Sequence, residues 1–186
     1  TNSLPGMSIV GLPDNAVSEA RERVHSAIKN SGYTFPTGKV IVNLAPADIR
    51  KEGTNYDLPI AVGILKEQGI DIPDDNNTAF LGELSLDGNL RKVNGILPLV
   101  SGLKENGITT VFVPEENARE AALVKDMVIL GVKHLADIAG HYTENPIKPT
   151  VIDINEYLAR NANTDFSYDF KDVKGQVKAK KALEIA

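Results

Sequence analysis

The sequence predicts an α/β fold, and two observations support this class. Short runs rich in β-branched residues alternate along the chain with longer runs whose apolar residues recur every three or four positions. Residues 78–103 contain both patterns, because apolar residues flank Asp87-Gly88 and helical spacing follows Asn94-Gly95. Asp-Gly between alternating apolar residues is a strong signal for a type I′ hairpin. We therefore expect a hairpin that leads into a helix, with the other elements packed on this unit.

The first predicted elements are a strand, a helix and a second strand. Residues 7–10 form a short strand, and a helix capped by Asp14 or Asn15 ends before Gly32. One face of this helix is apolar, and its polar face carries a Glu19–Arg23 pair at i,i+4 spacing. The apolar face consists of Val17, Ala20, Val24, Ala27 and Ile28. Residues 39–44 are the clearest strand in the sequence.

The second helix is predicted to be buried on most sides. Asp57 suits its N-cap, Pro59 fits the first turn, and Gly69 ends it. The helix is apolar nearly all round, which is typical of a core element. A polar loop, residues 48–55, precedes it.

The hairpin of residues 79–93 comes next, with Ala79-Phe80-Leu81 in its first strand, and a helix begins near Ile96. Strands at 109–113 and 127–130 then alternate with helices at 115–124 and 133–139, so the domain closes near Tyr142. Pro-containing residues 143–171 are typical of a linker, and a further helix begins within 172–186. Because the chain starts without Met and ends inside a predicted helix, we expect a fragment of a longer protein.

The composition excludes several classes of function. The 186 residues contain no cysteine, so neither a disulfide framework nor a cysteine nucleophile is possible. A net charge of -5 argues against a strongly basic nucleic-acid module, although a local basic patch remains possible. No apolar run approaches the length of a membrane span, and no signal peptide is present, so we expect a cytoplasmic protein.

Few residues form a recognisable chemical site. The one Gly-Lys pair, Gly38-Lys39, is followed by Val40 and therefore is not a P-loop, so no cofactor site is expected within this chain. The three histidines are dispersed without the spacing of metal ligands, and we expect no metal site. Two basic pairs, Arg50-Lys51 and Arg91-Lys92, have two interpretations. They are either a solvated loop and a charged strand edge, or contacts for DNA phosphates or a neighbouring subunit.

Ordered sequence strings resemble the magnesium-chelatase-like ComM/YifB family of AAA+ ATPases, from about Ser3 to Tyr142 and again from Asp172. The strings are SLPGM at 3–7, IVGLP at 9–13, EARERV at 19–24, SAI at 26–28, VNLAPAD at 42–48, KEG at 51–53, YDLPIA at 56–61, FLGEL at 80–84, DVKGQ at 172–176 and ALEIA at 182–186. The resemblance implies an N-terminal Lon-protease-like domain over residues 1–142, a linker over 143–171, and the start of an AAA+ module over 172–186. ATP and Mg²⁺ are implied for the part of that module beyond residue 186.

The implied fold is that of the Lon protease C-terminal domain (ribosomal small-subunit protein domain-like), with a mixed sheet and helices. Lon uses a serine and a lysine, and the resemblance places Ile60 and Leu97 at these two positions. Neither side chain can act as nucleophile or base. We therefore expect a pseudo-protease without catalytic residues, in which apolar side chains fill the former catalytic site as part of the core.

Three functions remain open. The resemblance implies a non-catalytic domain of a hexameric ATPase, similar to the ComM DNA branch-migration helicase, that contributes to ring assembly and DNA engagement. The alternative is a platform for protein partners without DNA contact, and the remote alternative is a Ser-Lys peptidase. Arg50, Lys51, Arg91 and Lys92 are the candidate DNA contacts.

Overall fold

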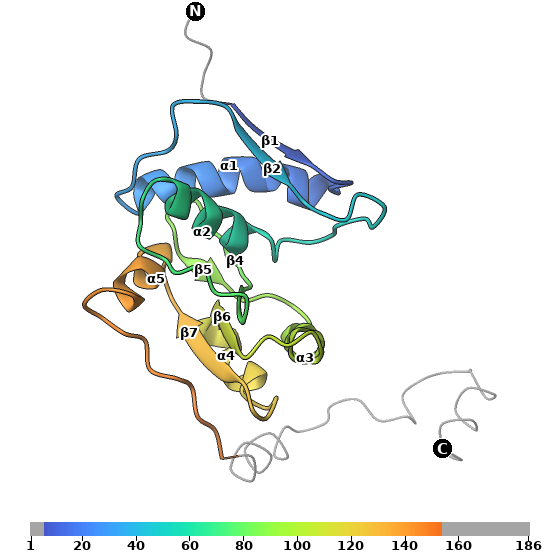
Figure 1. Ribbon diagram of the computed structural model, residues 1–186, viewed down its shortest axis with the longest axis vertical. Helices are drawn as coiled ribbons and strands as arrows, with labels where there is room; N and C mark the ends of the chain where they lie inside the picture. Colours follow the sequence, from blue (N-terminus) through green and yellow to red (C-terminus); the bar gives the residue numbers. More distant parts are fainter. Residues whose placement is uncertain (1–5, 154–186) are drawn as a thin grey trace, which may run out of the picture. The chain divides into compact units, whose positions relative to one another are not determined.

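A computed structural model describes residues 6–153 of the chain (Figure 1). The chain divides into two compact units, Thr1–Ile152 and Asp153–Ala186, and every element described below belongs to the first. This first unit runs beyond Tyr142, where the sequence predicts the end of the domain. The helix predicted within 172–186 and most of the predicted linker lie outside the described residues.

The N-terminal layer is a parallel strand pair covered by a helix. Strand β1 (Met7–Val10) pairs in parallel with β2 (Val40–Asn43), and helix α1 (Asn15–Asn30) connects them. Asp14 caps α1 by accepting a hydrogen bond from the Val17 N–H at 2.7 Å, and the five predicted apolar residues are buried. The prediction for this segment is confirmed.

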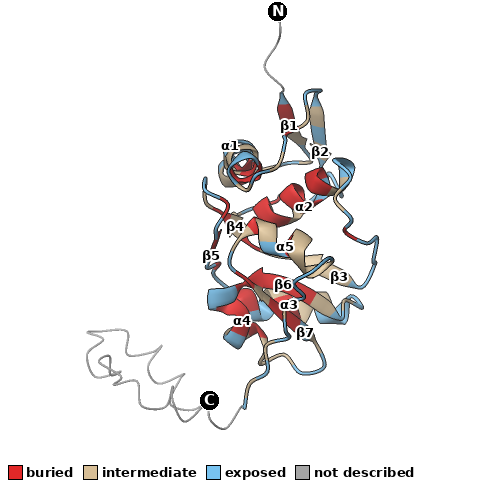
Figure 2. Ribbon diagram, turned by 90° about the vertical axis from the view of Figure 1, so that its left-hand side faces the viewer, coloured by how far each residue is buried: buried red, intermediate tan, exposed pale blue. Residues whose placement is uncertain are grey.

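A second layer is the parallel sheet β3 (Thr78–Phe80), β6 (Thr110–Pro114) and β7 (Val128–Val132), in the order β3-β6-β7. Its two faces contact different cores, since neighbouring side chains of a strand point to opposite faces. Val111 and Val113 of β6 pack with helices α3 (Ile96–Glu105) and α4 (Glu115–Ala121). Phe112 points to the other face, where it packs with helices α2 (Asp57–Glu67) and α5 (Leu135–His141). Figure 2 shows the resulting burial of α2 and β6.

The predicted hairpin forms, but with fewer residues and a different turn. The antiparallel pair is β4 (Glu83–Leu84) with β5 (Leu90–Arg91), whereas Thr78–Phe80 pairs in parallel with β6. Only Gly88 of the Asp87-Gly88 pair has positive φ, at 90°, so the type I′ turn is wrong. Five residues, 85–89, connect the strands. The Asp87 carboxylate holds this loop together by accepting hydrogen bonds from Ser85 Oγ and the Asn89 N–H.

The resemblance implies a mixed sheet with helices; the α/β class is confirmed, and the specific Lon-like fold stays a prediction. Among residues 6–153 the strands form three small sheets, two of them parallel and the β4–β5 pair antiparallel. The fold is therefore a mixed α/β arrangement.

The β4–β5 hairpin connects these two layers. Asn30 Nδ2 at the end of α1 donates to the Leu86 carbonyl at 2.7 Å. On the other side, the Leu90 N–H donates to the Lys133 carbonyl at 2.7 Å and the Leu135 N–H donates to the Gly88 carbonyl at 2.9 Å. The short hairpin is thus bonded to α1 through Leu86 and to the start of α5 through Gly88, both in its connecting loop.

Candidate functional site

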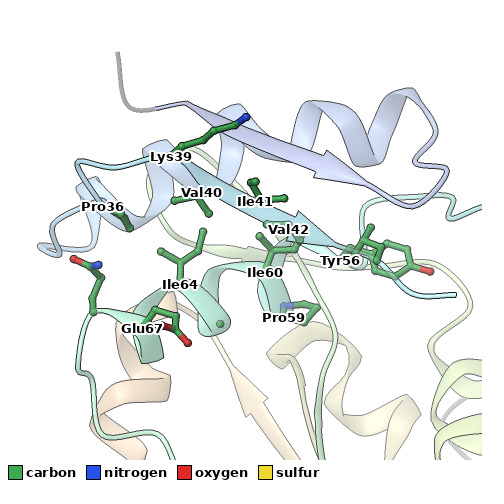
Figure 3. A pocket seen from close by; sticks show the side chains of 13 residues that line it. Pro36, Lys39, Val40, Ile41, Val42, Tyr56, Pro59, Ile60, Ile64 and Glu67 are labelled. Carbon is green, nitrogen blue, oxygen red and sulfur yellow. The ribbon is translucent and has the colours of Figure 1, made fainter. Parts of the chain in front are cut away.

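A groove of about 690 Å³ lies between β2 and α2 (Figure 3). Val40 and Val42 of β2 lie opposite Ile60 and Ile64 of α2, so the walls are mainly apolar. Tyr56 lies at one end, and Lys39 and Glu67 lie toward the other; Gln68 also lines the groove. Ile60, which the resemblance places at the position of the Lon serine, forms part of this groove and is only 6% exposed.

Leu97, which the resemblance places at the position of the Lon lysine, does not line the groove and is not core. Its helix α3 starts after Gly95, whose φ of 70° fits the predicted turn. The neighbours Ile96 and Val100 are fully buried, but the Leu97 side chain is 36% exposed because it lies on the other face of the helix. The interpretation that both positions are filled as core is therefore wrong for Leu97, and the structure places only Ile60 in the core.

The start of α2 is held by a buried ion pair that sequence reasoning missed. Asp57 is fully buried, and its carboxylate accepts hydrogen bonds from Arg23 Nε at 2.6 Å, Arg23 Nη2 at 3.0 Å and the Leu84 N–H at 3.1 Å. Burial raises the pKa of Asp57, opposed by the Arg23 guanidinium and the Leu84 N–H. The same ion pair raises the pKa of Arg23, chiefly through its hydrogen bond to Asp57.

One prediction is corrected near this pair and another is confirmed. Asp57 is the first residue of α2 rather than its N-cap, since Tyr56 occupies the N-cap position without a side-chain bond. Arg23 does contact Glu19, but at 3.9 Å, and its short bonds go to Asp57. A signal was available in the sequence, because Arg23 lies three residues after Ala20 and four before Ala27, next to the buried face of α1.

Of the first basic pair, only Arg50 is on the surface. Lys51 is 5% exposed, and its ammonium donates to the Ile49 carbonyl at 2.7 Å and to the Pro46 carbonyl. Its main chain also bonds to Leu12 and Asp14, at 3.1 and 2.9 Å. Lys51 therefore organises the loop between β2 and α2 and does not present its charge to a ligand. Arg50 is exposed and pairs at 3.4 Å with Glu52, which is equally exposed.

The second basic pair is exposed on the hairpin. Arg91 lies in β5 directly opposite Glu83 of β4, and Lys92 follows it. Both residues are exposed, so their charges are available to a partner. Among the residues described, no ion pair joins Arg91 or Lys92 to Arg50, which lies in the loop before α2.

Within residues 6–153, no three acidic, histidine or cysteine side chains converge on a point where a metal ion would fit. One histidine has a structural role: His134 Nδ1 accepts from the Ala136 N–H at 3.2 Å and caps α5. None of the helices described is both long and apolar enough to cross a membrane.

The chain belongs to the family of subunit ChlI of Mg-chelatase, whose model matches residues 1–117. Within this magnesium-chelatase-like group, it is 36% identical over 187 residues to competence protein ComM of Haemophilus influenzae. It is 39% identical over 194 residues to the protein YifB of Salmonella typhimurium. Each alignment covers all of this chain and 36% of the relative, so the chain spans about a third of these relatives' length. The expected family is confirmed.

A more distant likeness links the chain to a protease. Lon protease 2 of Bacillus subtilis is 28% identical over 141 residues, which cover 73% of this chain and 25% of that protein. Because the alignment covers 73% of the chain, it spans positions 60 and 97 wherever it begins.

Proposed function

We propose that this chain is the non-catalytic N-terminal domain of a hexameric AAA+ ATPase and contributes to ring assembly and DNA engagement. The observation that carries the proposal is the identity to ComM along the whole chain. ATP and Mg²⁺ then belong to the remainder of the protein, where the family resemblance implies an ATPase module. The likeness to Lon protease 2 supports a Lon-like fold for the domain.

The side chains at the two Lon positions support a role without peptide hydrolysis. Ile60 and Leu97 lack any atom that could attack a carbonyl or accept a proton. In the full-length ATPase, casein should therefore remain uncut with ATP present, in an assay that follows release of soluble peptides. Measurable turnover above a buffer control would contradict the assignment and revive the peptidase hypothesis.

Three exposed cations are the best candidates for DNA contact: Arg50, Arg91 and Lys92. Guanidinium and ammonium groups bind phosphate when they are free to reach it. Lys51 is left out of this set, because its ammonium is already bonded inside its own loop. At a net charge of -5, such contact would depend on local patches rather than on the charge of the whole domain.

The test uses the full-length protein with Arg50, Arg91 and Lys92 all changed to Glu. Each lost phosphate contact should lower the slope of log K against log salt by about 0.9 for duplex DNA, so affinity should fall at low salt. Fluorescence anisotropy of a labelled duplex or branched DNA over a salt series measures both quantities.

Two controls sharpen this test. A matched triple variant, with Arg21, Lys29 and Lys125 changed to Glu, makes the same change in charge at other exposed positions and should keep the wild-type slope. Lys51→Met should also keep the slope, because that ammonium does not face solvent. Unchanged binding by the first triple variant at low salt would remove the DNA contact and leave the protein-platform alternative.

A further inference from the structure

We propose that the free edge of β2 and the groove beside it bind an extended peptide segment of a partner protein. The segment adds to the β1–β2 pair as a third strand and places large apolar side chains in the groove. This binding site is independent of DNA engagement and gives the domain a means of recruiting a protein.

The main chain of β2 has bonding capacity to spare on one side. The Val40 and Leu44 N–H groups bond toward β1, to the Gly6 and Val10 carbonyls at 3.0 and 2.9 Å. In a parallel pair, every second residue of a strand bonds to its neighbour, and the alternate residues direct their N–H and C=O groups to the opposite side. Those residues are Ile41 and Asn43, and β1 is the one strand that pairs with β2 in the part of the chain described. Their main-chain groups therefore face outward at the spacing that another strand requires.

The groove follows this edge. Residues 39–42 line it consecutively, although their side chains point alternately to the two faces of the sheet. Consecutive lining means that the groove runs along the strand edge rather than beneath one face. Figure 3 shows Ile60 and Ile64 of α2 directed toward β2 from the opposite wall. A main chain bonded to Ile41 and Asn43 would carry its side chains against that apolar wall.

The edge also lacks the usual protection against strand pairing. Exposed edges are commonly blocked by charged residues, by proline or by a bulge. Strand β2 reads Val-Ile-Val-Asn, pairs with β1 without a bulge, and leaves Ile41 61% exposed. In contrast, the short β5 carries Arg91. A two-stranded sheet gains stability from a third strand, so an unblocked edge of this kind favours a partner strand.

The chemistry of the site indicates a polypeptide. Main-chain donors and acceptors at strand spacing match an extended peptide, and the apolar walls match aliphatic or aromatic side chains. Lys39 and Glu67 lie at the same end and carry opposite charges, so the groove does not favour a phosphate chain. A second copy of this domain fits less well, because its own α2 stands beside the same edge. A free segment meets no such obstruction.

The probe is a pool of acetylated, amidated heptapeptides with Val, Ile, Leu or Phe at alternate positions, Thr between them and Lys at one end. Peptides are added to the ¹⁵N-labelled chain, and amide exchange and chemical shifts are followed by NMR. On saturation, exchange at the Ile41 and Asn43 amides should slow at least about tenfold. The Val40 amide already bonds to Gly6 and should change little. This alternation is specific to strand addition.

The test variant is Gly63→Leu. Gly63 lines the groove within α2, and a Cβ added there meets no atom within 4 Å, so a larger side chain can start there and extend into the groove. Binding should weaken at least about tenfold. The matched control is Gly102→Leu in α3, another helical glycine with open space around its Cβ but outside the groove. It should bind like the wild type.

Four results would overturn the proposal. The first is that no member of the pool binds at 1 mM. The second is that binding persists in Gly63→Leu with a folded spectrum. The third is that the protected amides do not alternate. The fourth is that the Ile41 and Asn43 amides are protected without peptide in a concentration-dependent way, with a dimer in sedimentation velocity. That result would assign the edge to a second copy.

Discussion

Strands β2 and β6 are both rich in β-branched residues but differ in how far the fold buries them. Both are runs of β-branched and aromatic residues, Val-Ile-Val-Asn in β2 and Thr-Val-Phe-Val-Pro in β6. Residues 111–113 of β6 are fully buried, because β6 has a strand on each side and helices against both faces. In β2 every second residue is exposed. Residue types therefore predict that a strand forms, whereas the number of its neighbours decides how far it is buried.

The largest expected effect separates the two strands by stability. Phe112→Ala should lower the free energy of unfolding by about 3–5 kcal/mol, because it leaves a cavity beneath β6 where the ring stacks on Phe80. Ile41→Thr keeps a β-branched side chain on the exposed face of β2 and should change the free energy of unfolding by less than about 0.5 kcal/mol. Urea denaturation followed by circular dichroism measures both. Similar losses of unfolding free energy for the two variants would show that Ile41 contributes as much to stability as Phe112.

A smaller effect tests what holds the β1–β2 layer to the rest of the domain. Arg23→Met should cost about 1.5–3 kcal/mol, since the fully buried Asp57 carboxylate would lose its charged partner. Arg21→Met is the matched control on the same helix. Its partner Glu22 is exposed, so the change should stay within about 0.5 kcal/mol. If the two variants lost the same unfolding free energy in urea denaturation, the Arg23–Asp57 ion pair would not stabilise the packing of α1 on α2.

The smallest effect concerns the hairpin that joins the layers. Hydrogen bonds from Ser85 and Asn89 lower the pKa of Asp87 to about 2, from an ordinary value of 3.8. Because the folded pKa is the lower one, the stabilisation is present above about pH 4 and is lost as the pH falls toward 2. The amide shift of Asn89 should titrate with a midpoint near 2, and Asp87→Asn should remove that titration. A midpoint near 3.8 in the native protein would mean that the turn does not hold the carboxylate.

The sequence predicted most elements because their signals are local. Asp14 and the apolar face of α1 identify that helix, and Gly95 marks the start of α3. The errors concern long-range partners. Thr78–Phe80 carries no signal that distinguishes a hairpin strand from one paired with β6, about thirty residues away. The sequence predicts Lys51 to be an exposed cation in a loop. Only the folded loop shows that main-chain carbonyls bind its ammonium.

The candidate site was less accessible from sequence than the fold. Ile60 and Leu97 are both apolar residues near helix starts, yet one lines the groove and the other is partly exposed. The distinction depends on which helix face meets the core, and a short helix leaves that face ambiguous. The free edge of β2 has no sequence signature, because it is defined by the position of β1 and by α2 beside it.

The Arg23–Asp57 ion pair has a consequence for the orientation of α2. Its partners are 34 residues apart, and Asp57 is three residues before Ile60. A helix as apolar as α2 could pack in many orientations, but an orientation that separated the buried carboxylate from the arginine of α1 would leave an uncompensated charge. The bond that compensates this charge therefore also sets the direction in which Ile60 faces the groove.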